Sequence, residues 1–368
     1  MVFSSLFFLY AFLPLCLMVY QIPRTLKFKN LVLLAFSLFF YAWGEPFWII
    51  QMLISGIWVF LSGLFLDRYK HDPAMHKTIL VIGTVGALLP LFIFKYAGFF
   101  IEIINVLPLI NIPLPGWTMP IGISFYTFQI LSYLIDLYRG QCQVQKFLPD
   151  FLLYQTLFPQ LIAGPIVRYS DIEEQLRERR ITIRGLADGT KRFVIGLAKK
   201  TLIANYAGTL VAQTIGSGNL NILSGLECLI GIIAVTIQIY FDFSGYSDMA
   251  IGLGHMFGFK FKENFEYPYY SKSVTEFWRR WHISLGTFFR DYVYIPLGGN
   301  RHHRLRNAFI VWFLTGFWHG AGWNYIFWGL YYFAVLQIEK YLTLKYTEKI
   351  PRVIMWIPMS IVSMLGFA

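Results

Sequence analysis

Long apolar blocks alternate with short polar connectors along most of this chain. Clear examples cover residues 1–20, 30–43, 47–66 and 78–104, and similar blocks recur nearer the C-terminus. A helix that crosses a bilayer needs roughly 20 mostly apolar residues, whereas a transmembrane strand shows a shorter segment of alternating polarity. We therefore predict an all-α polytopic membrane protein with about ten transmembrane helices.

The composition supports a membrane protein. The 368 residues are 57% hydrophobic and only 14% charged, and the mean hydropathy is +0.54, whereas a soluble domain carries about 25% charged residues. The net charge of +11 gathers in short connectors such as residues 67–72, 177–184 and 300–306. Cytoplasmic loops of membrane proteins carry this excess of Lys and Arg, so we attribute the charge to membrane topology and expect no nucleic-acid partner.

Polar content divides the chain into two regions. Residues 1–115 form hydrophobic hairpins with few polar residues, and we interpret them as a scaffold. In residues 119–343, ionisable residues lie within or beside apolar runs, where they usually line a cavity or contact one another. We expect one domain over residues 1–368, with its functional, cavity-lining part in 119–343. The chain ends within the apolar run 354–368, which favours a truncated C-terminus.

The run FDFSGYSDMAIGLGHMFGF, residues 241–259, carries polar residues at helical spacing. On a helical wheel Ser244, Asp248 and His255 share one face. Gly245, Gly252 and Gly254 allow another helix or a ligand to approach closely. Two interpretations stay open: a buried polar cluster that fixes helix packing, and a face that binds a ligand.

The run EFWRRWHISLGTFFRD, residues 276–291, is too charged for a spanning helix. We expect an amphipathic helix that lies at the cytoplasmic surface or lines a polar cavity. If this helix is continuous, Arg279, His282 and Arg290 form one stripe. Such residues could anchor the helix to lipid headgroups. Two guanidinium groups beside an imidazole also suit an anionic substrate, such as the phosphates of a nucleotide-bearing cofactor.

The run TGFWHGAGWNYIFWG, residues 315–329, contains a single imidazole, His319. The glycines predict a break between two helical pieces at this residue, and Gly316, Gly320 and Gly322 leave room beside the ring. A neutral imidazole in an apolar site is a suitable general base, so an enzyme and a proton-coupled transporter are both open, as is a simple hairpin near the headgroups. No histidine pair has the i, i+4 helical spacing of a zinc site, and we expect no metal.

Four motifs together resemble the membrane-bound O-acyltransferase (MBOAT) superfamily, in particular the membrane subunits of bacterial alginate O-acetyltransferases. The run YIPLGGNR favours that branch over the D-alanyl transferases of teichoic acid. The four motifs are residues 158–172, 241–269, 276–301 and 316–329.

This resemblance implies helices arranged in a ring around a central funnel, with re-entrant or amphipathic helices on the cytoplasmic side. It implies that His319 is the catalytic histidine, deep in a channel, and that His282 is the second functional histidine. We extend the site to neighbouring polar and aromatic residues as donor-binding or channel residues: Arg279, Arg290, Ser244, Asp248, Trp318 and Asn324.

The expected reaction moves an acetyl group from a cytoplasmic thioester, acetyl-CoA, to a hydroxyl on the outer side, with no tightly bound cofactor. His319 acts as general base, and His282 orients the thioester or polarises its carbonyl. The expected acceptor is a periplasmic acetyltransferase or an exopolysaccharide such as alginate, and the expected location is the bacterial inner membrane.

Two alternatives remain at this stage. A D-alanyl transferase would take its acyl group from a carrier protein, for which the basic segment 177–184 could be the docking surface. A transporter would export acetyl-bearing or lipid-linked sugars without consuming a thioester.

Overall fold

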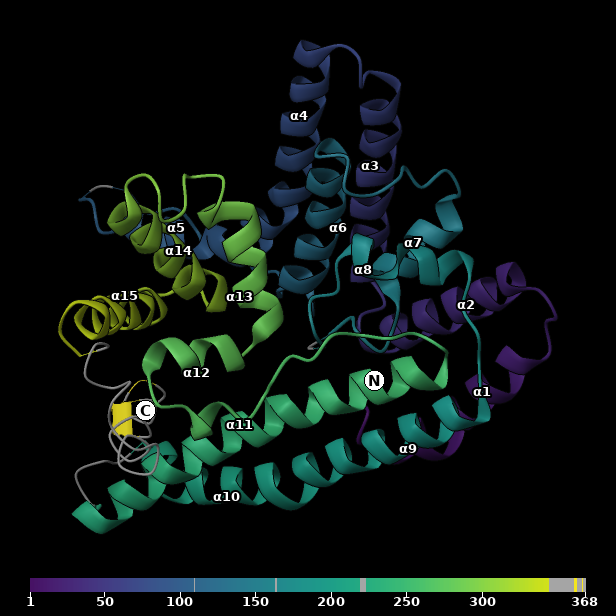
Figure 1. The fold of residues 1–368 in the computed structure, drawn as a ribbon. Coiled ribbons are helices and arrows are strands. Elements are labelled where there is room, and N and C mark those ends of the chain that lie inside the picture. Colours follow the sequence, from purple (N-terminus) through teal and green to yellow (C-terminus); the bar gives the residue numbers. More distant parts are fainter. Residues whose placement is uncertain (109, 163, 219–222, 344–360, 363–365, 367–368) are drawn as a thin grey trace. The chain divides into compact units, whose positions relative to one another are not determined.

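The fold is entirely helical in the part of the chain that the computed structural model describes, namely residues 1–108, 110–162, 164–218, 223–343, 361–362 and 366 (Figure 1). The α-helices are joined by short connectors and by several single turns of π- or 3₁₀-helix. Most of the C-terminal apolar run 354–368 lies outside the described residues. The helical fold class is therefore confirmed, whereas the ring and its funnel stay predictions.

The chain divides into two compact units. The first comprises Met1–Ala187 and Gly254–Phe261, and the second comprises Asp188–Leu253 and Lys262–Ala368. The composition change at residues 115–119 falls inside the first unit.

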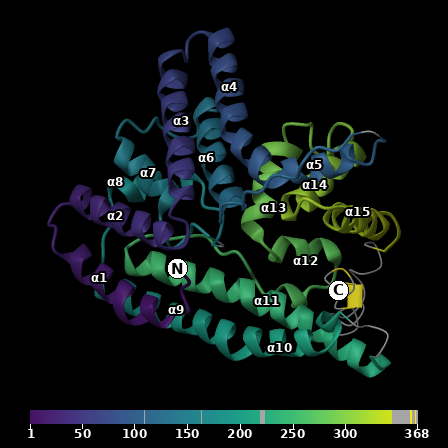
Figure 2. The same cartoon turned by 180° about the vertical axis from the view of Figure 1, so that it is seen from behind.

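The first unit contains eight α-helices among its described residues. They are α1 (Leu13–Gln21), α2 (Leu26–Gly44), α3 (Trp48–Arg68), α4 (Pro73–Leu91), α5 (Ala97–Ile104), α6 (Ile123–Tyr138), α7 (Leu148–Thr156) and α8 (Tyr169–Arg177). Helices α3, α4 and α6 pack against one another, as both views show (Figures 1 and 2).

The segment Gly254–Phe261 is held in the first unit by Arg179. The guanidinium donates hydrogen bonds to the Tyr20 hydroxyl at 2.8 Å and to the Phe257 carbonyl at 3.1 Å, and it lies 4.2 Å from the centre of the Phe259 ring. Part of the basic segment 177–184 is thus tied into the protein, so this arginine is not part of a solvated docking surface.

The second unit contains the remaining α-helices. They are α9 (Ile183–Ala198), which begins in the first unit, α10 (Asn205–Gln213), α11 (Gly225–Met256), α12 (Val274–Arg280), α13 (Ile283–Phe289), α14 (Arg304–His319) and α15 (Trp323–Ile338). A π-helical turn, Lys199–Ala204, joins α9 to α10, and another, Arg290–Tyr294, follows α13.

Four helical stretches in the described part of the chain are long and apolar enough to cross a membrane: Leu26–Gly44, Trp48–Arg68, Pro73–Ile104 and Gly225–Met256. Other apolar blocks form helices that are too short on this criterion, since α14 and α15 have 16 residues each. By length and composition, the described residues thus contain four candidate membrane-spanning helices, fewer than the predicted number of about ten.

Candidate active site

Helices α9 and α11 approach each other closely in the second unit because glycines remove the side chains between them. A Cβ atom on Gly196 would lie 2.5 Å from the carbonyl oxygen of Gly245, and one on Gly252 would lie 2.6 Å from that of Gly189. The two pairs run in opposite directions along the two helices, so the helices are antiparallel. The prediction that Gly245 and Gly252 allow another helix to approach closely is confirmed. At Gly254 the close neighbour is the Phe261 ring, 2.7 Å from an added Cβ atom, and not a helix.

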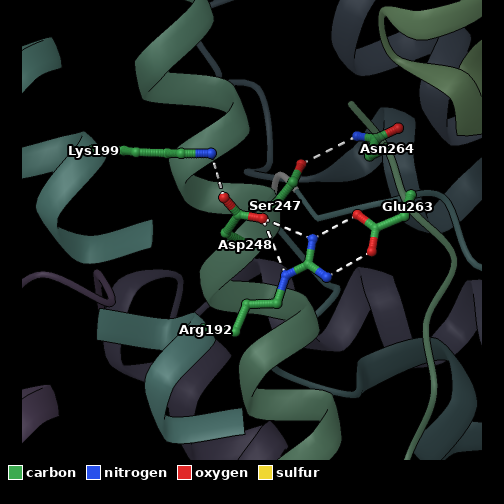
Figure 3. Close-up of polar contacts among 6 residues, drawn as sticks. All are labelled: Arg192, Lys199, Ser247, Asp248, Glu263 and Asn264. Carbon is green, nitrogen blue, oxygen red and sulfur yellow. Dashed lines mark hydrogen bonds and ion pairs between the residues drawn. The ribbon is translucent and has the colours of Figure 1, made fainter. Parts of the chain in front are cut away.

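An ion-pair network crosses this helix pair (Figure 3). Asp248 on α11 accepts hydrogen bonds from Arg192 at 2.8 Å and from Lys199 at 2.6 Å. Arg192 also donates to Glu263 at 2.6 and 2.5 Å, so it joins α9, α11 and the segment that follows α11. Hydrogen bonding to Glu263, and then to Asp248, raises the pKa of Arg192.

A cavity of about 470 Å³ opens beside this network in the second unit. Ser244 and Asp248 both line it, which confirms that these two residues share a face of α11, whereas His255, the third residue predicted on that face, does not line it. The Ser244 hydroxyl is buried and has no hydrogen-bond partner among the described residues. The cationic and anionic side chains of the lining largely neutralise one another, since it holds Arg192, Lys191 and Lys199 together with Asp188, Asp248, Glu263 and Glu266.

His282 lies at a break in the chain and not on a continuous helix. Helix α12 ends at Arg280, Trp281 is extended, and His282 has a left-handed backbone with φ 44° and ψ 55° before α13 begins at Ile283. A non-glycine residue in this region is uncommon and often marks a functional constraint. The predicted continuous amphipathic helix over residues 276–291 is therefore wrong. The break turns both Trp281 and His282 into the interior, where they are 3% and 2% exposed.

The imidazole of His282 is oriented by Asn264. The Asn264 Oδ1 atom lies 3.2 Å from Nδ1 of His282 and also accepts hydrogen bonds from the backbone N–H and the hydroxyl of Ser284. On the other side of the amide, Asn264 Nδ2 donates to the Ser247 hydroxyl of α11 at 3.2 Å. The Nε2 atom of His282 is buried and has no hydrogen-bond partner among the described residues.

Aromatic rings surround the rest of this imidazole. Its centroid lies 4.7 Å from that of Phe243 and 5.8 Å from that of Trp318. Burial lowers the pKa of His282 well below its ordinary value, and the neighbouring charge of His319 lowers it further. Burial disfavours the charged imidazolium, so His282 is neutral at physiological pH.

His319 is the last residue of α14, and Trp323 begins α15, so the predicted helix break at this motif is confirmed. The His319 side chain is exposed, in contrast to the buried ring that the apolar run suggests. Its centroid lies 4.9 Å from that of Trp318 and 4.8 Å from that of Trp328. Trp318 therefore contacts the rings of both histidines, and it connects them within the second unit.

The glycines beside His319 do not leave room around its ring, contrary to the prediction. A Cβ atom on Gly316 would lie 2.3 Å from the carbonyl oxygen of Tyr325, and one on Gly320 would lie 2.1 Å from the Tyr325 ring. Both glycines therefore serve the close packing of α14 on α15. A Cβ atom on Gly322 would lie 2.6 Å from the Asn324 Oδ1 atom, so this glycine does not leave room beside the ring either.

The remaining predicted site residues lie on exposed positions. Arg279 is exposed on α12, and Asn324 is exposed in the first turn of α15. Arg290 is exposed and pairs with its neighbour Asp291 at 2.6 Å. The stripe predicted to join Arg279 and Arg290 to His282 does not form, because the chain breaks at His282.

Sequence reasoning missed the residues that orient His282. Asn264 and Glu263 lie in the run KFKENFEYP, and Arg192 lies in TKRFVIG. Of these, only Asn264 is buried, and the position of its amide among aromatic residues is the one hint of this in the sequence. No periodic pattern connects these segments.

The described geometry is that of a helical membrane protein with a buried imidazole, His282, held by an amide, and an exposed imidazole, His319, that contacts the same tryptophan ring. The sequence matches the MBOAT, membrane-bound O-acyltransferase family over residues 36–359, and the chain belongs to that family. It is an acyltransferase and a multi-pass membrane protein, and it falls in the branch whose members are named alginate O-acetylases.

Similar proteins include enzymes with different named acceptors. The chain is 41% identical over its whole length to 71% of the probable alginate O-acetylase AlgI of Pseudomonas aeruginosa. It is 34% identical to the peptidoglycan O-acetyltransferase of Helicobacter pylori, over 97% of this chain and 74% of that protein. It is 27% identical to the teichoic acid D-alanyltransferase of Streptococcus thermophilus, over 81% of this chain and 83% of that protein.

Proposed function

We propose that this protein transfers an acetyl group from a cytoplasmic thioester, acetyl-CoA, across the bacterial inner membrane to a hydroxyl of a periplasmic acetyltransferase or an exopolysaccharide such as alginate. The higher identity to proteins named as O-acetylases than to those named as D-alanyltransferases favours acetyl as the group transferred. Membership of an acyltransferase family disfavours the transporter alternative.

The observation that carries the chemical part of this proposal is the pair of interacting histidines. Burial holds His282 neutral, whereas the side chain of His319 is exposed and can be reached by an acceptor hydroxyl. We therefore assign the general base to His319. It removes the proton of the acceptor hydroxyl as the oxygen attacks the thioester carbonyl, and the thiolate of the donor leaves and is then protonated.

His282 acts on the donor as a hydrogen-bond acceptor. To polarise the thioester carbonyl, its Nε2 atom would have to carry a proton, which burial and the Nδ1 contact with Asn264 both disfavour. A bare Nε2 atom accepts a hydrogen bond from an N–H or O–H group, such as an amide of the pantetheine arm. Orientation of the thioester is thus the favoured one of its two predicted roles.

Replacing His319 by alanine tests this assignment. We expect a loss of about 10²–10⁴ in the rate of thioester consumption, because general base catalysis contributes that much. The assay follows labelled acetyl-CoA in inverted membrane vesicles from cells that contain the native acceptor. His282→Ala should also reduce the rate, whereas His71→Ala, an exposed loop histidine, should not. Full activity of a well-folded His319→Ala protein would contradict the assignment.

A further inference from the structure

The side-chain amide of Asn264 has only one orientation that satisfies its neighbours. The backbone N–H of Ser284 can only donate, and it points at the Asn264 atom placed as Oδ1, 3.1 Å away. Ser284 lies in the first turn of α13, where helix N–H groups have no partner within the helix. The oxygen of the amide therefore faces α13 and His282, and the nitrogen faces Ser247.

This orientation determines where His282 carries its proton. An amide oxygen only accepts hydrogen bonds. The Nδ1 atom of His282 lies 3.2 Å from this oxygen and 3.3 Å from the Ser284 hydroxyl. The single proton of that hydroxyl is donated to the nearer Asn264 Oδ1 atom at 2.8 Å, so Nδ1 donates its own proton to the amide oxygen. A neutral imidazole has one N–H, which leaves Nε2 bare. We propose, on the basis of the function proposed above, that Asn264 is a positioning residue that fixes His282 in the tautomer with the proton on Nδ1 and presents Nε2 to the substrate.

Asn264 is itself held from several directions. It is fully buried, so water does not compete for its amide. Its backbone carbonyl accepts a hydrogen bond from the N–H of Ile283 at 2.9 Å, and its side chain reaches Ser247 on α11. The preceding residue, Glu263, is fixed to α9 by Arg192 (Figure 3). The ion-pair network therefore anchors the segment that orients the histidine.

Selective ¹⁵N labelling of histidine gives a direct readout of this tautomer. The signals of His282 in the full protein, in lipid nanodiscs, are assigned by their loss in His282→Gln. We expect a protonated Nδ1 and a bare Nε2 in the wild type. In Asn264→Ala we expect a mixture of tautomers, together with a fall of about 10- to 100-fold in kcat for acetyl transfer and a smaller change in KM for acetyl-CoA.

The conservative variant separates positioning from simple loss of structure. In Asn264→Asp a carboxylate still accepts the hydrogen bond from Nδ1, so the tautomer and part of kcat should be restored. The negative charge favours the imidazolium, so the pKa seen in the pH dependence of kcat should rise. The matched control is Asn307→Ala. Asn307 is also fully buried but donates to the carbonyls of Leu297, Gly299 and His302, so its loss should lower thermal stability and leave the His282 signals unchanged.

A wild-type protein with the proton on Nε2, or an Asn264→Ala protein with unchanged imidazole signals, would overturn the inference. A changed tautomer with an unchanged rate of acetyl transfer would instead uphold the role of Asn264 and contradict the role proposed for His282.

Discussion

At the scale of single residues, the two histidines of the second unit lie in different surroundings. His282 is enclosed by aromatic rings and oriented by an amide, whereas His319 is exposed at the end of α14. Both histidines stand out in the sequence because each is the single imidazole of a tryptophan-containing run, which is charged around His282 and apolar around His319. Their surroundings could not be predicted, because the left-handed backbone at His282 and its contact with Asn264 depend on tertiary packing.

The buried His282 should make folding stability depend on pH. The unfolded chain binds a proton at this histidine below about pH 6.5, and the folded protein does not because burial lowers its pKa. The resulting decrease in the free energy of unfolding is absent above pH 6.5. It grows by up to about 1.4 kcal/mol per pH unit as the pH falls towards the pKa of His282 in the folded protein. We expect the melting temperature of His282→Gln to fall less steeply below pH 6.5 than that of the wild type, in thermal unfolding measured across pH.

The control is His71→Gln, which removes an exposed histidine and should leave the fall in melting temperature as in the wild type. An equal loss of stability with acid in the wild type and in His282→Gln would show that His282 does not resist protonation.

At the scale of elements, glycines decide which helices touch. The helix break at residues 319–323 was predictable, because Gly320 and Gly322 lie two residues apart within an otherwise regular apolar run. The break at His282 was not, because the sequence there contains no Gly or Pro before Gly286 and keeps a helical pattern. The use of Gly316 for packing against α15, and not for space beside an imidazole, required the position of the neighbouring helix.

Gly316→Ala should therefore destabilise the second unit. The new methyl group would meet the Tyr325 carbonyl oxygen at 2.3 Å, and overpacking of this kind costs about 1–3 kcal/mol. The matched control is Gly98→Ala on α5, where no atom lies within 4 Å of the added group. That change should stabilise its helix by about 0.5–1 kcal/mol. Thermal unfolding in one detergent compares the two, and equal melting temperatures would contradict the packing assigned to Gly316.

At the scale of the whole molecule, composition and block length indicated a helical membrane protein, since burying this much apolar sequence in lipid requires helices. The number of spans could not be obtained in the same way. The apolar runs of α14 and α15 form helices of only 16 residues each. Apolar length alone therefore does not distinguish a helix that crosses the bilayer from one that packs inside the protein. The family assignment, by contrast, rests on four long motifs and was confirmed by the relatives.

Acetyl transfer from one side of the membrane to the other is the central claim, and inverted vesicles test it most directly. Acetyl-CoA labelled in the acetyl group is supplied outside the vesicles, which corresponds to the cytoplasmic side, and acetyl esters are measured on material inside. The account predicts labelled esters in the lumen, with one CoA thiol released outside for each ester. Equal accumulation of label from a thioether analogue that cannot be cleaved, or release of CoA thiol with no ester inside, would contradict it.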